Sequence, residues 1–320
     1  MGKNLISKKI LITGGSGYVG GFLSKYLFDK GLDITISTSQ LKKSNLIKSI
    51  SIDWKKPINL SSKFDIIIHA AGIPAQICEK DPELAFKFNY EKTKELLDHA
   101  INSSCEKFYF ISTAHVYKSP LVGTFDDESK KNNQHPYAAS KRMAEDYLLD
   151  KIQKNKIQGS VIRLTNCFGP PETLKNDCWN LSINQFVLSA ICNQNIIIKN
   201  NPYNRRDFIS LSEFSRLFFQ IIAMKNKNPK EILIASSEAR EILDVANEIK
   251  KIIERESRIK VQVDYDKEIQ TKSELQFITK NLNKINLHYD KNIFEETLID
   301  LITYIKDMPQ SLLLELNSKI

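Results

Sequence analysis

The sequence predicts an α/β fold, in which a doubly wound parallel sheet is followed by a smaller α+β part. Three observations predict it: short apolar runs alternate with helical patterns through the first half of the chain, glycines cluster directly after the first run, and the pattern becomes irregular after residue 166. Such alternation implies parallel strands, because each parallel pair needs a crossover connection, which a helix supplies.

The expected elements follow one another along the chain. Strands are expected where apolar residues run together, and helices where they recur at a spacing of three and four. The expected strands are 8–14, 32–38, 64–70, 107–113 and 159–165, with a short one before Asp53. The expected helices are 17–30, 83–102, 137–154, 181–192, 212–225, 243–255 and 293–306. We expect a first domain over 1–165 and a substrate-binding part over 166–320, with a segment near 205–235 that can return to the first.

Composition and charge exclude several classes of protein. The formal charge is +8, but only eight of the 46 basic residues are arginines and the lysines are scattered, so we expect no nucleic-acid partner. No apolar run approaches the ~18 residues that a membrane helix needs, and no signal peptide is visible. The cysteines are scattered and odd in number, which predicts a reduced, cytoplasmic protein without a disulfide or metal site. They are Cys78, Cys105, Cys167, Cys178 and Cys192.

The first expected strand runs into a turn with a glycine at every third position. Gly14, Gly17 and Gly20 stand between this strand and an amphipathic helix. A pyrophosphate suits this arrangement, because glycines let the backbone approach closely and the first N–H groups of the helix bind an anion. The alternative is a tight turn without a ligand. The context favours a Rossmann-type dinucleotide site.

The end of the second strand bears on the choice between NADP and NAD. An NAD enzyme carries an acid here for the ribose 2′-hydroxyl, whereas this chain has Thr38 and Ser39, followed by Lys42 and Lys43. Hydroxyl and ammonium groups suit a 2′-phosphate, so we expect NADP, with NAD as the second choice. The alternative for the two lysines is a solvated pair. Asp53 follows the third strand, where a carboxylate can meet the adenine amino group.

Tyr137 precedes Lys141 by four residues at the start of an expected helix. Positions i and i+4 share a face, so the phenol and the ammonium group lie one turn apart. Taken alone, this spacing is also what two half-exposed polar side chains on a surface would show, and it occurs by chance in many chains.

Five motifs in a fixed order decide how this pair is interpreted. They are TGGSGYVG, ISTAHVY, PYAASK, RLTNCFGP and RRDFISL. Together they resemble the extended short-chain dehydrogenase/reductase family, in particular its nucleotide-sugar epimerases, dehydratases and reductases. The resemblance covers residues 9 to about 225 and is loose beyond them.

The resemblance implies a catalytic set of Thr113, Tyr137 and Lys141. Tyr137 would exchange a proton with a sugar oxygen while hydride moves to or from a nicotinamide. Thr113 would hydrogen-bond the same oxygen, and Lys141 would hold the nicotinamide ribose. Because Lys141 and an oxidised nicotinamide are both positive, we expect the pKa of Tyr137 to fall below its usual value of about 10.

The resemblance also implies binding residues. Asn89 matches a residue near the catalytic lysine, whereas Asn166 and Arg206 match residues that hold the substrate phosphates; a turn asparagine or a surface arginine is the alternative. His115 is expected near the sugar as a hydrogen-bond donor or second acid, or else as scaffolding. The expected cofactor-binding set is Gly14, Ser16, Gly17, Tyr18, Val19, Gly20, Thr38, Ser39, Asp53, Trp54, Ala70, Ala71, Gly72, Asn89, Tyr137 and Lys141.

The reaction stays open between two enzyme types acting on a nucleotide-diphosphate sugar. Ala114 and His115 stand where the family's dehydratases carry an acid pair, which argues against 4,6-dehydration. The absence of an acid at Thr38 favours an NADPH-dependent reductase of a 4-keto-6-deoxy sugar, as used for surface polysaccharide precursors; the alternative is a 4-epimerase that retains NAD. A catalytically silent regulatory or RNA-binding relative is a third possibility, which the intact catalytic set disfavours. The resemblance further implies a homodimer, formed through the helix near 85–102 and the helix of Tyr137.

Overall fold

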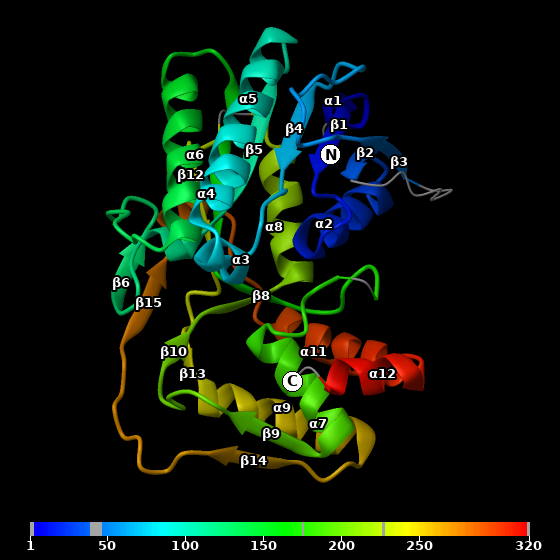
Figure 1. Ribbon diagram of the computed structural model, residues 1–320, viewed down its shortest axis with the longest axis vertical. Helices are drawn as coiled ribbons and strands as arrows, with labels where there is room; N and C mark the ends of the chain where they lie inside the picture. Colours follow the sequence, from blue (N-terminus) through cyan, green and yellow to red (C-terminus); the bar gives the residue numbers. More distant parts are fainter. Residues whose placement is uncertain (1–2, 39–46, 175, 226–227, 319–320) are drawn as a thin grey trace.

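A seven-stranded parallel sheet forms the centre of the molecule (Figure 1). The computed structural model describes residues 3–38, 47–174, 176–225 and 228–318. Every neighbouring pair of strands in this sheet is parallel, so the α/β prediction is confirmed. In spatial order the strands are β12 (Glu231–Ile234), β7 (Gln158–Leu164), β5 (Lys107–Thr113), β4 (Ile66–His69), β1 (Lys9–Thr13), β2 (Asp33–Thr38) and β3 (Lys48–Ser51).

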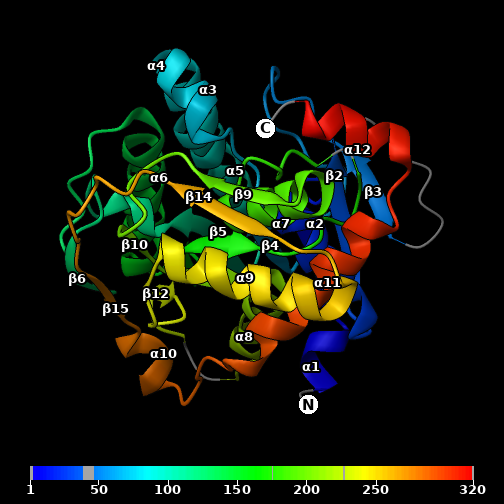
Figure 2. The same cartoon turned by 90° about the horizontal axis from the view of Figure 1, so that it is seen from below.

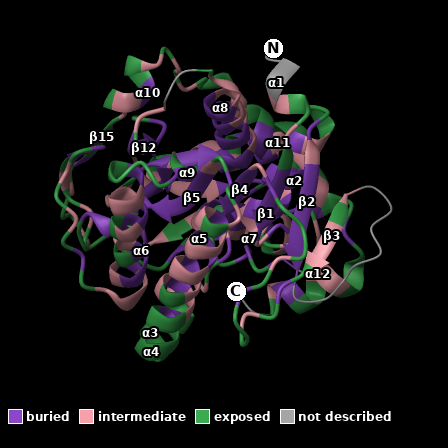
Figure 3. Cartoon of the chain, turned by 90° about the horizontal axis from the view of Figure 1, so that it is seen from above, coloured by how far each residue is buried: buried purple, intermediate pink, exposed green. Residues whose placement is uncertain are grey.

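The central strands are buried on both faces, because their side chains alternate between two hydrophobic clusters. Ile10 and Ile12 of β1 belong to one cluster and Leu11 belongs to the other. Burial on both faces explains why these strands are continuous apolar runs. Figure 3 shows the buried strands among helices whose outer faces are exposed. The covering helices are α2 (Tyr18–Asp29) and α8 (Leu211–Ala223) on the side of Ile10, and α5 (Lys92–Asn102) and α6 (Pro136–Gln153) on the side of Leu11.

The chain leaves the sheet after β7 and returns to it later. β8 (Asn166–Phe168) pairs in parallel with β11 (Phe208–Ser210), and α8 follows β11 directly. β12 then pairs with β7 at the edge of the sheet. The segment between β11 and β12 thus supplies both a covering helix and the last strand of the sheet.

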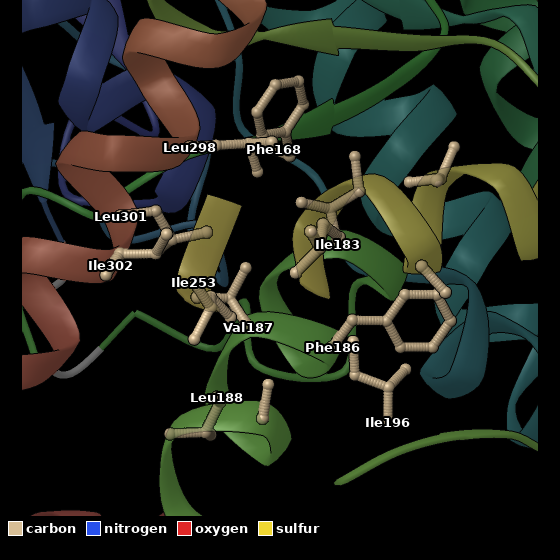
Figure 4. Close-up of a cluster of buried hydrophobic side chains, with 14 of the residues drawn as sticks. Phe168, Ile183, Phe186, Val187, Leu188, Ile196, Ile253, Leu298, Leu301 and Ile302 are labelled. Atoms are coloured by element: carbon tan, nitrogen blue, oxygen red, sulfur yellow. The ribbon is translucent and has the colours of Figure 1, made fainter. Parts of the chain in front are cut away.

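A separate hydrophobic cluster lies below the sheet in Figure 1, between helices that Figure 2 shows from below. Figure 4 shows its centre, where Val187, Ile253 and Leu298 come from three different helices. The elements around it are α7 (Ser182–Asn193), α9 (Ile242–Ser257), α11 (Asn292–Lys306), α12 (Gln310–Asn317) and the parallel pair of β9 (Asn195–Ile198) and β14 (Gln262–Tyr265).

Short elements make up the rest of the described chain. They are α1 (Lys3–Ile6), α3 (Ala75–Lys80), α4 (Pro82–Ala85), α10 (Lys280–Lys284), the pair of β6 (Gly123–Asp126) and β15 (Leu275–Ile278), and the pair of β10 (Arg205–Arg206) and β13 (Arg240–Glu241). Within the described ranges, no helix is both long enough and apolar enough to cross a lipid bilayer.

Candidate active site

The candidate site residues gather at the carboxyl ends of β1, β4 and β5. These strands are neighbours and parallel, so their ends meet at one edge of the sheet. The glycine turn follows β1, Gly72 lies just beyond β4, and Thr113 is the last residue of β5. This edge is where open α/β sheets bind their ligands.

The glycine turn is built for close approach of its own backbone. Gly14 has a φ of +70°, and its carbonyl accepts a hydrogen bond of 2.8 Å from the Gly17 N–H. A Cβ on Gly20 would lie 2.3 Å from the Gly14 oxygen, so only glycine fits there. α2 then begins with no side-chain cap and no acidic residue in its first turn. Its free N–H groups and this tight turn fit a pyrophosphate.

We expect Gly20→Ala to lower the affinity for a dinucleotide by at least about tenfold, because the added carbon forces α2 away from the turn; an overpacked site of this kind costs about 1–3 kcal/mol. Fluorescence titration with NADH and NADPH measures the loss. Gly21→Ala is the matched control, since its Cβ would lie 3.5 Å from the nearest atom, the Gly15 oxygen. Equal affinity in the two variants would contradict the role of Gly20.

Tyr18 and Ser16, two residues of the expected cofactor-binding set, make hydrogen bonds to other parts of the protein. The Tyr18 hydroxyl donates to the Gly169 carbonyl at 2.9 Å and accepts from the Asn184 amide at 3.2 Å. Burial raises the pKa of this phenol well above its usual value. The Ser16 carbonyl accepts from the Asn176 amide at 2.8 Å. Tyr18 is therefore left to meet a cofactor through its backbone N–H and not its ring.

The adenine end of the expected site is described only in part. Thr38 is the last residue of β2 and is buried, whereas Ser39, Lys42 and Lys43 lie outside the described residues. Asp53 lies two residues beyond β3 and is exposed; its carboxylate accepts from the Lys55 N–H at 3.0 Å. The Trp54 ring packs at 5.3 Å from the ring of Phe88, measured between centroids.

The segment after β4 brings the turn and the catalytic helix together. A Cβ on Gly14 would lie 2.7 Å from the Ala71 nitrogen, and one on Gly20 would lie 3.3 Å from the Ala70 side chain. A Cβ on Gly72 would lie 3.0 Å from the Lys141 ammonium nitrogen. Small residues at 70–72 thus leave room for the turn on one side and for Lys141 on the other.

Asn89 ties this segment to α6 from an irregular helix. The expected helix at 83–102 contains a π-helical segment, Phe86–Glu91, between α4 and α5. Asn89 lies in it, buried, and its Oδ1 accepts from the Ile73 N–H at 2.9 Å while its Nδ2 donates to the Ser140 hydroxyl at 3.3 Å. π-Helical turns occur often at functional sites.

The three expected catalytic side chains meet at the end of β5. The side chain of Thr113 lies close enough to the Tyr137 phenol to lower its pKa in part. Lys141, one turn further along α6, donates to the Ile111 carbonyl at 3.2 Å, and its ammonium nitrogen lies 4.8 Å from the centroid of the Phe110 ring. The phenol and the ammonium group thus both face the strand end, and the pair is not a surface feature.

The expected substrate residues also lie together, although they come from three elements. His115, in the short 3₁₀ turn after β5, shares a side-chain hydrogen bond with Asn166 of β8. Surrounding protein atoms, which displace water from the ring although part of the side chain stays exposed, lower the pKa of His115, and the positive charge of Arg206 lowers it further. Arg206 of β10 donates to the Ser182 hydroxyl at 3.2 Å and is exposed, as is His115. A guanidinium, a neutral imidazole and an amide together suit a polar, anionic ligand.

The model of the NAD dependent epimerase/dehydratase family matches residues 10–235. The chain belongs to this family. Its sequence is 28% identical over 221 residues to the ADP-L-glycero-D-manno-heptose-6-epimerase of Brachyspira hyodysenteriae, a match that covers 64% of this chain and 69% of that protein. The resemblance inferred from the five motifs is therefore confirmed.

Solved structures show the same fold as this member of the epimerase/dehydratase family. The UDP-N-acetylglucosamine 4-epimerase of Methanobrevibacter ruminantium, in complex with UDP-N-acetylmuramic acid, superposes with a TM-score of 0.78 at 22% identity, over 94% of this chain and 99% of that one. MoeE5, in complex with UDP-glucose and NAD, gives a TM-score of 0.77 at 15% identity, over 93% and 98%.

The lowered pKa expected for Tyr137 assumes a bound oxidised nicotinamide and stays a prediction for this epimerase/dehydratase relative. Burial raises the pKa of Tyr137 to about 12, and the Thr113 side chain only partly offsets it. Burial also lowers the pKa of Lys141 to about 8. Withdrawal from water disfavours the charged form of both groups. A phenolate at Tyr137 therefore depends on charge that a bound cofactor brings.

The sequence analysis missed a buried polar network behind the catalytic set of this family member. Glu145 of α6 and Arg163 of β7 are both fully buried and pair with each other, with 2.8 Å between Arg163 Nη2 and Glu145 Oε2. Tyr117, next to the site in sequence, points away from it, because its hydroxyl accepts from Arg163 at 3.2 Å. In the sequence, the only sign of this network is that Glu145 follows Lys141 by four residues and so lies on the same face of the helix.

Proposed function

We propose that this enzyme oxidises a hydroxyl of a nucleotide-diphosphate sugar to a ketone and reduces it again on the other face, as an NAD-retaining epimerase. The observation that supports this most is that Thr113, Tyr137 and Lys141 come together at the carboxyl end of β5, beside the glycine turn. Relatives named as sugar-nucleotide epimerases support this reaction. Other relatives are named as dehydratases, and Ala114 and His115, in place of an acid pair, disfavour that reaction.

The roles of the side chains follow from their chemistry. A bound nicotinamide would supply the hydride acceptor and donor. Tyr137 would take the proton of the sugar hydroxyl and later return it, while Thr113 would orient the oxygen. Lys141 would favour the phenolate by its charge. His115, Asn166 and Arg206 would hold the sugar and its diphosphate, since a planar guanidinium pairs with two phosphate oxygens.

A second candidate is a reductase of a nucleotide-linked 4-keto-6-deoxy sugar. The observation that favours it is Thr38 at the end of β2, where a carboxylate would repel the 2′-phosphate of NADPH and a hydroxyl does not.

Purified protein offered a panel of nucleotide-linked sugars separates the two. An epimerase carries NAD after purification and interconverts isomers without net use of cofactor, whereas a reductase consumes NADPH with keto sugars and binds it more tightly than NADH. Mass spectrometry and cofactor absorbance report both. No turnover of any member of the panel would contradict both candidates.

Replacing Arg206 by Met should raise the KM for the nucleotide sugar by about tenfold or more and change kcat little, because a diphosphate contact is made equally in the ground and transition states. Arg205→Met is the matched control, because the Arg205 guanidinium donates to the Ala239 carbonyl. It is therefore not one of the expected substrate residues. Steady-state kinetics measure KM and kcat for both variants. An unchanged KM in Arg206→Met would show that Arg206 does not bind the substrate.

The proposed homodimer has an apolar surface available. Leu84, Phe86 and Met143 are large apolar side chains that are more than a third exposed, on α4, the π-helical segment and α6. A charge buried in such a contact is costly, so Met143→Glu should convert a dimer to a monomer in sedimentation velocity. A dimer of unchanged stability would place the contact elsewhere.

A further inference from the structure

The end of β5 is joined to three successive turns of α6. The Ile111 carbonyl accepts from Lys141, and the Ser112 hydroxyl donates to the Glu145 carboxylate. The Thr113 side chain lies near the Tyr137 phenol. Residues 137, 141 and 145 are spaced by four, so they share one face of the helix. Glu145 is thus the third member of the face that carries the catalytic pair.

The carboxylate of Glu145 is paired with two cationic side chains. Arg163 donates to it through Nε at 3.1 Å and Nη2 at 2.8 Å, and the Lys131 ammonium group lies 3.3 Å away. Arg163 also contacts Glu231, the Tyr117 hydroxyl and the Asp127 carbonyl. A buried carboxylate persists only with such partners.

Lys141 is surrounded by groups that are neutral near pH 7. From α3 comes Cys78, whose thiol has a raised pKa; from β4 comes His69, whose pKa burial lowers to about 3; and Tyr137 comes from its own helix. The Phe110 ring and the Ile111 carbonyl of β5 complete its surroundings. Burial lowers the pKa of Lys141, and the charges of Cys78 and then of Glu145 raise it in part. Near pH 7 the Cys78 thiol keeps its proton, so among these described neighbours Glu145 is the anion that remains.

We propose that Glu145 is a positioning residue whose carboxylate, fixed by Ser112 and Arg163, keeps Lys141 in its ammonium form. Lys141 is 4% exposed, and an ammonium group so far from water needs a nearby anion to remain charged. The part that Lys141 plays in turnover rests on the proposed function, but its charge state does not and can be measured without any substrate.

The test is a titration of the Lys141 side chain by ¹³C–¹⁵N NMR of the full-length protein. A lysine with a pKa of about 8 separates from solvated lysines, and Lys141→Arg identifies its signal. In Glu145→Gln the midpoint should fall by about one pH unit, because one nearby negative charge is lost. Asp146→Asn is the matched control: Asp146 is exposed and contacts the same Lys131 at 2.7 Å, so its midpoint should stay at the wild-type value. An unchanged midpoint in a folded Glu145→Gln variant would overturn the proposal.

Circular dichroism checks whether Glu145→Gln folds with Arg163 left short of a partner. If it does not fold, Ser112→Ala decides. This variant keeps both charges and removes only the hydroxyl that fixes the carboxylate toward β5. The Lys141 midpoint should then move in the same direction by a smaller amount, whereas the wild-type midpoint in Ser112→Ala would refute the proposal. Because no sugar or cofactor is present, neither result depends on whether the epimerase assignment is right.

Discussion

Tyr137→Phe should reduce turnover of the nucleotide sugar by about 10²–10⁴-fold, the usual contribution of a general acid–base group, and leave cofactor affinity unchanged. In the proposed function the phenol exchanges the proton of the sugar hydroxyl, and it lies beside Thr113 at the end of β5. Phe keeps the ring, so packing is preserved. Steady-state kinetics measure the loss, and NADH fluorescence titration measures the affinity.

Tyr147→Phe is the matched control for this variant. Tyr147 lies on the same helix, but its hydroxyl donates to Asp98 of α5 at 2.6 Å, away from the catalytic face. Its turnover should match that of the wild type. If Tyr137→Phe kept full turnover, another group would exchange the proton and the proposed chemistry would have to be given up. If a cellular role of the protein survived the loss of turnover, the chain would act there through binding alone.

The sheet was predictable because its strands carry their own signal. Residues 9–13 of β1 form an apolar run buried on both faces, and this is visible without knowledge of any partner. The placement of the proposed catalytic residues was predictable for a similar reason: Tyr137 and Lys141 are local neighbours on one helix, and Thr113 ends a strand. Their roles stay a prediction.

What could not be predicted depends on contacts between distant residues. The Tyr18 hydroxyl donates to the Gly169 carbonyl, 151 positions further along the chain. The glycine motif around Tyr18 contains no sign of this contact, so the orientation of the ring could not be predicted. The π-helical turn around Asn89 changes one helix locally and leaves its apolar pattern readable as an α-helix. The sequence also could not show how deeply the Tyr137 phenol is buried, and this burial raises its pKa in the protein without a cofactor.

Arg163→Met should lower the free energy of unfolding by about 3–5 kcal/mol, because it leaves the buried carboxylate of Glu145 without its main partner. Arg163 is fully buried and joins α6 to β7 and, through Glu231, to β12. Urea denaturation followed by circular dichroism measures the loss. Arg255→Met is the matched control: Arg255 pairs with Glu256 and Glu295 on the surface, where such pairs contribute about 0–1 kcal/mol.

The loss should come mainly from the uncompensated charge and not from the missing contacts. Removing both partners together, in Arg163→Met with Glu145→Leu, should therefore restore part of the stability that Arg163→Met alone removes. The reason is that an apolar pair leaves no carboxylate to desolvate, while a lone carboxylate in the same place must be buried or protonated. If the two substitutions simply added, the pair would contribute through packing alone, and the charge would have no special part in holding α6 against the sheet.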